Sequence, residues 1–494
     1  MVKVSFALGK VFRYHSWFLG SRLEGRYAMK ADVVILGAGS GGEMLASLLG
    51  AQGKSVAIIE ENLVGGECPF FACMPSKAML RSAAIRFYAQ HTIEVGASSS
   101  PLELDDRKKA FASAVNRRDE ICDHLQDNAK EQNLVDLGVK VIRGHGQIDS
   151  PGVVKIASQE IHYTDLVIST GSVATIPPIT GLDFVDYWTT DKALTSDYLP
   201  DSLIVIGGGP AGCELAQIYS RFGTKVVLIE PAKNLISKEE SLISHELEGF
   251  FLREGIEVIL GISIKKVTKT DQGKSNLELE DGRVLIADKL LVSTGRVPNT
   301  KGLGLDSLGV LVKKSGAIDI DSHCRINGTK NLWACGDVAG IAPLVHTANY
   351  QARIIAAGIL GGNRVANYEA IPRAVYTSPS IASVGMSFKD ALAAGFCAIT
   401  SAFDLKNTSR NAVDGGNGGL LILTADKKSR TLIGAAAIGP HADEWISEAV
   451  LAIRAKVSLD ILADVVHAFP TYGEAYEQPI RDLLAACSNE SPAH

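Results

Sequence analysis

The sequence predicts an α/β fold in which two similar βαβ units are followed by a further region of helices and strands. The first observation is the turn Gly37-Ala-Gly39-Ser-Gly-Gly42, which follows the short apolar strand 31–36. The second is the same pattern at Gly207-Gly-Gly209-Pro-Ala-Gly212, after the apolar strand 202–206. The third is the length, because 494 residues are too many for one core and predict about three domains. Both turns are typical of Rossmann-like domains.

The composition is that of a soluble globular protein, with 46% hydrophobic and 21% charged residues. A formal net charge of -6 gives no electrostatic reason to expect a nucleic-acid partner. No stretch approaches ~18 uninterrupted apolar residues, so we expect no membrane span. Eight cysteines are scattered along the chain and only Cys68 and Cys73 lie close together. This usage predicts a reducing, cytoplasmic location with one redox pair rather than a secreted disulfide scaffold.

Residues 1–28 form an N-terminal extension that is separate from the rest. They carry five basic side chains and a single acid, Glu24. A targeting segment is one interpretation, but the apolar patches are short and no cleavage motif follows them. We favour the simpler interpretation that translation starts at Met29, and we exclude the extension from fold reasoning.

The first βαβ unit has every part of a dinucleotide-binding cradle. The strand 31–36 leads into Gly37, Gly39 and Gly42, then into a helix expected over 43–51 and a strand over 55–59 that ends at Glu60. The glycines allow a tight turn and close approach of a pyrophosphate to the helix N-terminus. Glu60 is placed to accept a hydrogen bond from a ribose hydroxyl.

The second unit repeats the first. After Gly207, Gly209 and Gly212, a helix is expected over 213–222 and a strand over 226–229, ending at Glu230. Two cradles in one chain predict two dinucleotides, and FAD with NAD or NADP is the economical pair. A carboxylate at Glu230 favours NAD, because it accepts from a 2′-hydroxyl and repels a 2′-phosphate. Only Lys233 is close enough in sequence to oppose this preference.

The cysteine pair lies in the segment Gly65-Gly66-Glu-Cys68-Pro-Phe-Phe-Ala-Cys73-Met-Pro-Ser-Lys77. Five residues on an ideal helix separate two Cα atoms by roughly 7.5 Å along the axis. A disulfide needs about 4.4–6.8 Å, so we expect a distorted or only partly helical segment. Two unrelated buried cysteines are the plain alternative. A metal site is not expected, because no second pair at ligand spacing exists.

From about Met29 onward the chain resembles the flavin-dependent pyridine nucleotide-disulfide oxidoreductases, which include dihydrolipoamide dehydrogenase, glutathione reductase and mercuric reductase. Four further motifs occur in the family's order: Ser169-Thr170-Gly171, Ser293-Thr-Gly295-Arg296-Val-Pro-Asn299, Ala334-Cys-Gly-Asp337 and Tyr376-Thr-Ser-Pro379. The resemblance implies that Gly66, Lys77, Thr170, Gly171, Gly295 and Asp337 help to bind the cofactors. It also implies a C-terminal α+β dimerisation domain and a homodimer.

The resemblance implies a mechanism as well. Electrons from NADH reach FAD and then the sulfur nearer to it, Cys73, while Cys68 exchanges with the acceptor. Lys77 and Glu214 match the family's ion pair beside the flavin. The plain alternative for Glu214 is a first-turn acid stabilised by the helix dipole.

The segment His467-Ala-Phe469-Pro-Thr-Tyr-Gly-Glu474 departs from the family's pattern. The family has a histidine at the position of Phe469, and this histidine and a glutamate, here Glu474, form the general base of the partner subunit. Phenylalanine carries no proton, and general-base assistance is typically worth ~10²–10⁴ in rate. We expect His467 to be structural rather than a replacement.

Other departures are close to the cysteines or near the chain end. Glu67 stands where the family usually has threonine, and Phe70 with Phe71 makes the segment between the cysteines apolar. Mercuric reductases carry a vicinal cysteine pair near the C-terminus, whereas this chain has only Cys487 there.

The expected domains are the extension (1–28), a FAD domain (29–185) completed by a central segment (310–365), an NAD(P) domain (186–309) and a dimerisation domain (366–494). The leading functional hypothesis is an NADH-dependent disulfide oxidoreductase acting on a small-molecule or carrier-bound acceptor. A quinone or other small acceptor is the close alternative. A flavoprotein that senses redox state and acts by binding is the alternative from another class.

Overall fold

The first predicted βαβ unit lies at the centre of a seven-stranded sheet in the computed structural model, which describes residues 29–488. Strand β1 pairs in parallel with both β2 and β6, so its apolar run is buried on both faces. The strands of this sheet are β1 (Met29–Leu36), β2 (Val56–Glu60), β3 (Lys140–Arg143), β4 (Gln147–Ser150), β5 (Val153–Ile156), β6 (Gln159–Ile168) and β17 (Leu332–Ala334).

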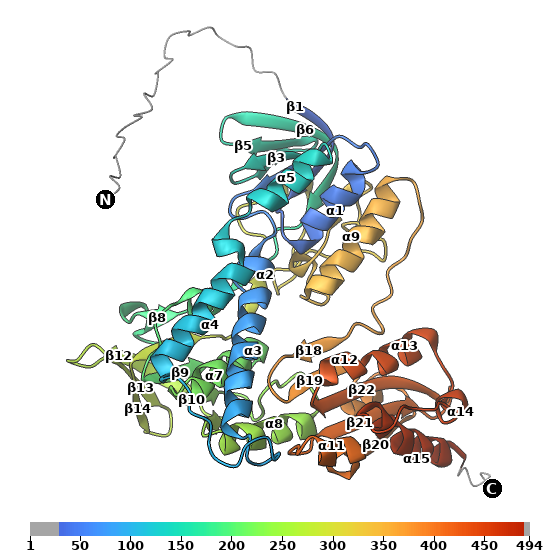
Figure 1. Ribbon diagram of the computed structural model, residues 1–494. Helices are drawn as coiled ribbons and strands as arrows, with labels where there is room; N and C mark the ends of the chain where they lie inside the picture. Colours follow the sequence, from blue (N-terminus) through green and yellow to red (C-terminus); the bar gives the residue numbers. More distant parts are fainter. Residues whose placement is uncertain (1–28, 489–494) are drawn as a thin grey trace, which may run out of the picture.

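A segment from the middle of the chain completes this first lobe. Strand β17 pairs with β6, and the helix that follows, α9, packs against α1 (Figure 1). The helices around the first sheet are α1 (Ser40–Gly50), α5 (Asn128–Asp136) and α9 (Val345–Ile359).

The second βαβ unit lies in a parallel five-stranded sheet, in the order β11-β10-β9-β15-β8. Its strands are β8 (Tyr187–Trp188), β9 (Ser202–Ile206), β10 (Lys225–Glu230), β11 (Glu257–Leu260) and β15 (Lys289–Val292). Helices α6 (Thr190–Thr195), α7 (Pro210–Arg221) and α8 (Ser241–Arg253) belong to this lobe, as does the antiparallel sheet of β12 (Ile264–Lys269), β13 (Ser275–Leu279) and β14 (Val284–Ala287). A two-stranded sheet of β7 (Ser172–Ala174) and β16 (Arg296–Pro298) pairs the chain as it leaves the first lobe with the chain as it returns.

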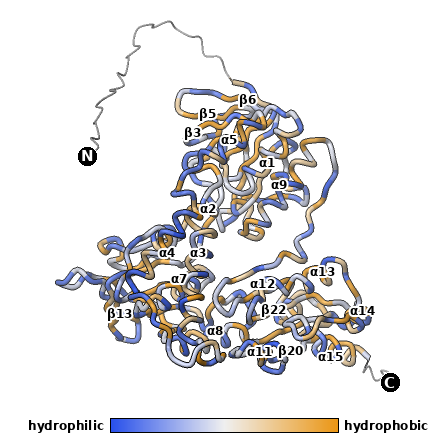
Figure 2. The backbone as a smooth tube through the Cα atoms, in the orientation of Figure 1, coloured by the Kyte–Doolittle hydropathy of each residue, from blue (hydrophilic) through white to orange (hydrophobic). Residues whose placement is uncertain are grey.

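The third lobe is an antiparallel sheet covered by helices, in the order β18-β19-β22-β21-β20 (Figure 1). Its strands are β18 (Arg373–Val375), β19 (Ser380–Gly385), β20 (Ala398–Asp404), β21 (Leu420–Asp426) and β22 (Thr431–Gly439). Its helices are α10 (Phe388–Ala393), α11 (Ser409–Val413), α12 (Ala442–Trp445), α13 (Ser447–Ala455), α14 (Leu459–Leu462) and α15 (Glu477–Ser488). The hydropathy along the backbone agrees with this layering, since the buried strands are the apolar ones (Figure 2).

Two long helices link the first lobe to the second. Helix α3 (Cys73–Gln90) starts just after the four-residue helix α2 (Glu67–Phe70) and packs against both α4 (Arg107–Ile121) and α7 (Figure 1). One end of α3 therefore carries a cysteine, and its other end reaches the lobe of the second cradle.

The structure confirms the predicted fold class and both βαβ units. Each cradle helix begins three residues before its predicted start, at Ser40 and Pro210. The glycine-rich sequence belongs to the first helical turn there, because a small residue is needed where that turn packs on the preceding loop. The domain boundaries stay predictions, and residues 1–28 lie outside the described residues. Within the described part, no helix has the length and apolar character needed to cross a bilayer.

Candidate active site

The first cradle is held closed by Glu60. Its carboxylate accepts from the backbone N–H of Ala38 and of Asn62, each at 2.7 Å, and the side chain is buried. Burial raises the pKa of Glu60, while the two N–H donors oppose that rise. Gly37 has φ +95°, and a Cβ on Gly42 would lie 2.0 Å from the Gly37 carbonyl oxygen. Only glycines allow the turn to fold this tightly.

The second cradle repeats this arrangement atom for atom. Glu230 accepts from the N–H of Gly208 at 2.7 Å and of Ala232 at 2.8 Å. Gly207 has φ +108°, and a Cβ on Gly212 would lie 1.9 Å from the Gly207 carbonyl oxygen. The shared design explains why one sequence pattern occurs twice.

Both cradles fit a dinucleotide. A Cβ built on Gly39 or on Gly209 meets nothing within 4 Å, so each glycine borders open space at the start of its helix. Both have a backbone conformation that alanine also adopts, with φ -68° and -75°. Their missing side chains therefore leave room for a ligand rather than relieve backbone strain, as expected beside a pyrophosphate. Gly66 packs from the other side, where its Cβ would lie 2.7 Å from Cα of Gly39.

The remaining predicted cofactor residues gather at the exit of the first lobe. Ser172 donates to Asp337 at 2.6 Å, and Arg296 donates to Ser172 Oγ at 2.8 Å and to Glu67 at 2.5 Å. Thr170 donates to the carbonyl oxygen of Asn299 at 2.7 Å. Gly171 and Gly295 take positive φ in the same crossing, at +69° and +110°. Glu67, unusual at this position, is therefore neutralised by Arg296.

The segment with the two cysteines is a broken helix, which confirms the predicted distortion. Helix α2 ends at Phe70, the linking residues Phe71 and Ala72 have non-helical φ/ψ, and α3 starts at Cys73 itself. Both cysteines are thiols in the structure and both are partly buried. When Cys73 ionises, a hydrogen bond from the Cys68 thiol stabilises its thiolate. The break thus brings the two sulfurs together, as a regular helix could not.

This hydrogen bond separates the ionisation of the two thiols. It is the largest cause that lowers the pKa of Cys73, to about 7, with the Lys77 charge adding to it against burial. The pKa of Cys68 is raised, because its proton is held by Cys73 and because the sulfur is buried. The position of Cys73 at the first turn of α3 acts in the same direction, since a helix N-terminus favours a thiolate. Cys73 is therefore the thiolate of the pair.

Lys77 and Glu214 form an ion pair, although 137 positions separate them. The Nζ–Oε2 distance is 2.9 Å, and the side chain of Glu214 is 6% exposed against 35% for Lys77. Glu214 also accepts from the Ser76 hydroxyl at 2.6 Å and from the N–H of Tyr376 at 3.0 Å. Lys77 Nζ lies 4.4 Å from the centre of the Tyr376 ring. Helix α7 starts at Pro210, so Glu214 lies beyond its first turn, and its burial and partners favour the ion pair over the plain alternative of a first-turn acid.

The C-terminal segment lies apart from the cysteines in the subunit. Phe469 is 75% exposed. The His467 side chain is 7% exposed and its Nε2 lies 3.1 Å from the Glu448 carboxylate, with Glu477 at 3.5 Å from Nδ1. Glu474 accepts from the N–H of Ser409 at 3.2 Å. His467 is thus engaged inside the third lobe, as a structural histidine would be.

Sequence reasoning missed two residues of the site, Ser76 and Tyr376. Ser76 directly precedes Lys77 and shares its carboxylate partner. Tyr376 belongs to one of the four family motifs, but its contacts with Glu214 and Lys77 join segments that are far apart in the sequence. Of the two apolar residues between the cysteines, Phe70 is 1% exposed and belongs to the core.

Two family models match the chain. The model described as pyridine nucleotide-disulphide oxidoreductase covers residues 31–352. The chain belongs to this family. The model described as the dimerisation domain of the same family covers residues 371–480, which supports a homodimer.

Curated relatives agree with this assignment. The dihydrolipoyl dehydrogenase of Chlamydia muridarum is 31% identical over 94% of this chain and 98% of its own length. The mercuric reductase of Streptomyces lividans is 31% identical over 90% of this chain and 94% of its own length.

Solved structures share the fold. The HOCl-induced flavoprotein disulfide reductase RclA from Escherichia coli, as its Cu(II) complex, superposes with a TM-score of 0.80 at 25% identity, covering 91% of this chain and 99% of that one. LpdA from Mycobacterium tuberculosis gives the same TM-score at 24% identity, covering 92% and 100%.

As a member of this family the protein is a flavoprotein disulfide oxidoreductase that uses FAD and NAD(P)H. Two cradles that each fit a dinucleotide agree with the two cofactors of the family. Within residues 29–488, no cluster of three or more histidine, cysteine or acidic side chains is arranged to hold a metal ion.

Proposed function

We propose that the protein carries electrons from NADH to a redox disulfide formed by Cys68 and Cys73, and from there to an acceptor. The observation that carries this proposal is the thiol pair across the helix break, beside the partly buried Lys77–Glu214 ion pair. Neither feature is needed for folding a Rossmann-like domain. Together they supply a two-electron store and a fixed positive charge at one end of α3.

The chain's own residues account for the chemistry around the cofactors. FAD, when bound, accepts a hydride from the nicotinamide and delivers the electron pair to sulfur. Overall, NADH and the disulfide give NAD⁺, one thiol and one thiolate, with the S–S bond broken and the single proton of the hydride left on the thiol. Cys73 is left as the thiolate, and Lys77 stabilises its charge. Cys68 has the higher pKa and keeps its proton. We assign to Cys68 the thiol–disulfide exchange with the acceptor.

We propose NADH rather than NADPH as the donor. Glu230 holds its carboxylate at the end of β10 through the N–H groups of Gly208 and Ala232. An anion fixed there repels a 2′-phosphate and accepts from a 2′-hydroxyl. The ratio of kcat/KM for the two nucleotides tests this preference, and Glu230→Gln is expected to reduce it.

Stopped-flow reduction of the holoprotein by NADH tests the enzyme against the redox-sensor alternative. An enzyme is reduced within its turnover time, whereas a sensor has no need to consume NADH. Cys73→Ser provides the comparison, because it keeps both cradles and removes the disulfide. If steady-state turnover of every acceptor is unchanged in Cys73→Ser, the proposed role of the cysteine pair is wrong.

A second candidate keeps the same donor and cofactor but reduces a quinone or another small acceptor. The observation that favours it is Phe469, which presents a ring 75% exposed where the family has its histidine. The side chain of His467 is 7% exposed and has its carboxylate neighbours, Glu448 and Glu477, within the third lobe, which favours a structural role for it. A quinone takes two electrons from NADH and two protons, one of them from solvent, to give a hydroquinone and needs no base from the protein.

A panel of acceptors separates the two candidates. Steady-state NADH oxidation is measured with lipoamide, glutathione disulfide and several quinones at matched concentrations. The quinone candidate predicts that quinone turnover exceeds lipoamide turnover by at least the ~10² that a general base supplies. Lipoamide turnover at a rate typical of good enzymes would contradict it.

A further inference from the structure

A second concave site lies at the opposite end of α3 from the cysteines. It is a cavity of 310 Å³ formed where α3, α4, α7 and α8 meet. This volume falls at the small end of the range for small-molecule sites, about 300–1,000 Å³. Its lining residues from α7 lie at the C-terminal end of that helix, and none of the lining residues belongs to the glycine-rich turn of either dinucleotide cradle.

The lining carries far more positive than negative charge. Four guanidinium groups line the cavity, against one carboxylate, Glu254; the four are Arg86, Arg107, Arg221 and Arg253. Arg107 forms an ion pair with Asp201, whose carboxylate lies outside the lining. Arg86 contacts only the carbonyl oxygen of Asp105, and Arg253 lies over the Phe250 ring. Two of the four charges therefore have no carboxylate partner among the described residues.

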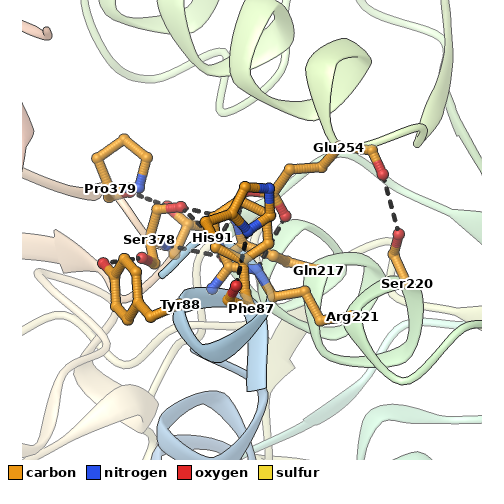
Figure 3. A network of polar contacts seen from close by, with 10 residues as sticks. Phe87, Tyr88, His91, Gln217, Ser220, Arg221, Glu254, Ser378 and Pro379 are labelled. Carbon is orange, nitrogen blue, oxygen red and sulfur yellow. Dashed lines mark hydrogen bonds and ion pairs between the residues drawn. The ribbon is translucent and has the colours of Figure 1, made fainter. Parts of the chain in front are cut away.

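Arg221 is a buried arginine of this site and is held by several hydrogen bonds (Figure 3). Its side chain is 3% exposed and forms a fork on Glu254, through Nε at 2.8 Å and Nη2 at 2.7 Å. Nη2 also donates to the carbonyl oxygen of Ser378 at 2.9 Å. Nη1 is buried and has no hydrogen-bond partner. A buried donor without a partner is costly, so such groups in native proteins need an explanation such as a ligand.

The surroundings hold Arg221 in this position. The Phe87 ring lies 4.4 Å from the guanidinium carbon on one side, and His91 packs on the same ring with centres 4.2 Å apart. Gln217 donates to both Glu254 and Ser378 and accepts from the Ser378 N–H, so the residues around the guanidinium are cross-linked (Figure 3). The guanidinium of Arg221 is therefore held in a fixed position at the cavity wall, and a preorganised positive charge favours binding of an anion.

We propose that this cavity binds a small anion that carries two or more negative charges on phosphate or carboxylate groups. The volume admits more than a single small ion, and the charges of Arg86 and Arg253, which have no carboxylate partner among the described residues, favour an occupant with negative charge. Guanidinium groups suit both anion types, because their planar fork binds two oxygens at once.

Isothermal titration of the full-length FAD holoprotein tests the proposal. Inorganic phosphate, pyrophosphate and citrate are the probes, and saturating NAD⁺ is present so that the second cradle is filled. At least one probe is expected to bind, and the comparison of citrate with the phosphates identifies the preferred group. Arg86→Gln and Arg253→Gln should each weaken that binding by at least about tenfold.

Arg454→Gln is the matched control, because Arg454 is exposed on α13 and far along the chain from the cavity. Both tested arginines lie at the surface end of the site, so FAD content and Tm should stay unchanged. Saturable binding lost in the two cavity variants and kept in the control supports the proposal. Binding that is equal in all variants, or no binding tighter than about 1 mM for any probe, overturns it.

Discussion

At the scale of single residues, the neighbours of Cys73 determine how readily its thiol ionises. It starts α3, receives a hydrogen bond from Cys68 and feels the charge of Lys77. All three influences stabilise its thiolate, and they outweigh burial. The chain thereby makes one sulfur an anion and keeps the other as a thiol, which gives the two cysteines different tasks.

The ionisation of Cys73 predicts a pH profile. In the reduced holoprotein, alkylation of Cys73 by iodoacetamide should rise through an apparent pKa of about 7, because the thiolate is the reactive form. Below that pH the thiol is protonated and labelling is slow. Cys68→Ala removes the donor, so the midpoint should move upward. Mass spectrometry of the labelled peptide measures it, and an unchanged midpoint in Cys68→Ala would refute the assigned hydrogen bond.

Phe469 predicts a gain of activity. Phe469→His places a proton acceptor where the family has one, so lipoamide turnover should increase by at least about tenfold, a conservative part of what a base supplies. Phe469→Gln is the control, since it is polar and does not titrate. Equal turnover in the two variants would show that the missing base does not limit this reaction.

At the scale of elements, the two cradles could be predicted because the residues that define each of them lie close together in the sequence. Turn, helix and terminal acid all lie within about 30 residues, the length of one βαβ unit. The Lys77–Glu214 pair was expected only through the family resemblance, since 137 positions separate the partners. The contacts of Tyr376 and the cavity around Arg221 were not predicted at all. They arise where helices and a linking segment from distant parts of the chain meet, and no sequence period marks such a meeting.

The cradles predict two separable cofactor defects. Gly39→Ala and Gly209→Ala both keep an allowed backbone and meet no protein atom within 4 Å, so both proteins should fold. The added methyl group occupies the space for one pyrophosphate in each case. Gly39→Ala should lose FAD, with affinity at least about tenfold weaker. Gly209→Ala should keep FAD and bind NADH weakly.

Absorbance of bound FAD and the Kd for NADH distinguish these outcomes. Each variant serves as the other's control, because the substitution is the same and the position in the unit is equivalent. Loss of both cofactors in both variants would indicate general misfolding instead. Retention of both cofactors would contradict the assignment of the cradles.

At the scale of the whole molecule, the third lobe carries exposed apolar side chains that suit contact with a second copy of the chain. Val466 is 93% exposed and Phe469 75%, and both lie in the region 371–480 that matches a dimerisation domain. Large exposed apolar side chains close together are typical of an interaction surface. The segment that departs from the family at Phe469 therefore belongs to the face expected between subunits.

This surface predicts the effect of a charge on assembly. Val466→Asp should weaken the homodimer, because a carboxylate would be buried without a partner. Val284→Asp is the control, since Val284 is 57% exposed on β14, in a different lobe. Light scattering with size-exclusion chromatography measures the mass of each. A dimer of unchanged stability in Val466→Asp would exclude this surface.

The most direct test of the central claim follows electrons from NADH to the cysteines. The oxidised holoprotein is treated anaerobically with one equivalent of NADH, then alkylated, and the labelled cysteines are identified by mass spectrometry. We predict that Cys68 and Cys73 are both labelled after NADH and unlabelled before it, and that Gly209→Ala prevents the change. Labelling of the two cysteines that does not depend on NADH would contradict the account.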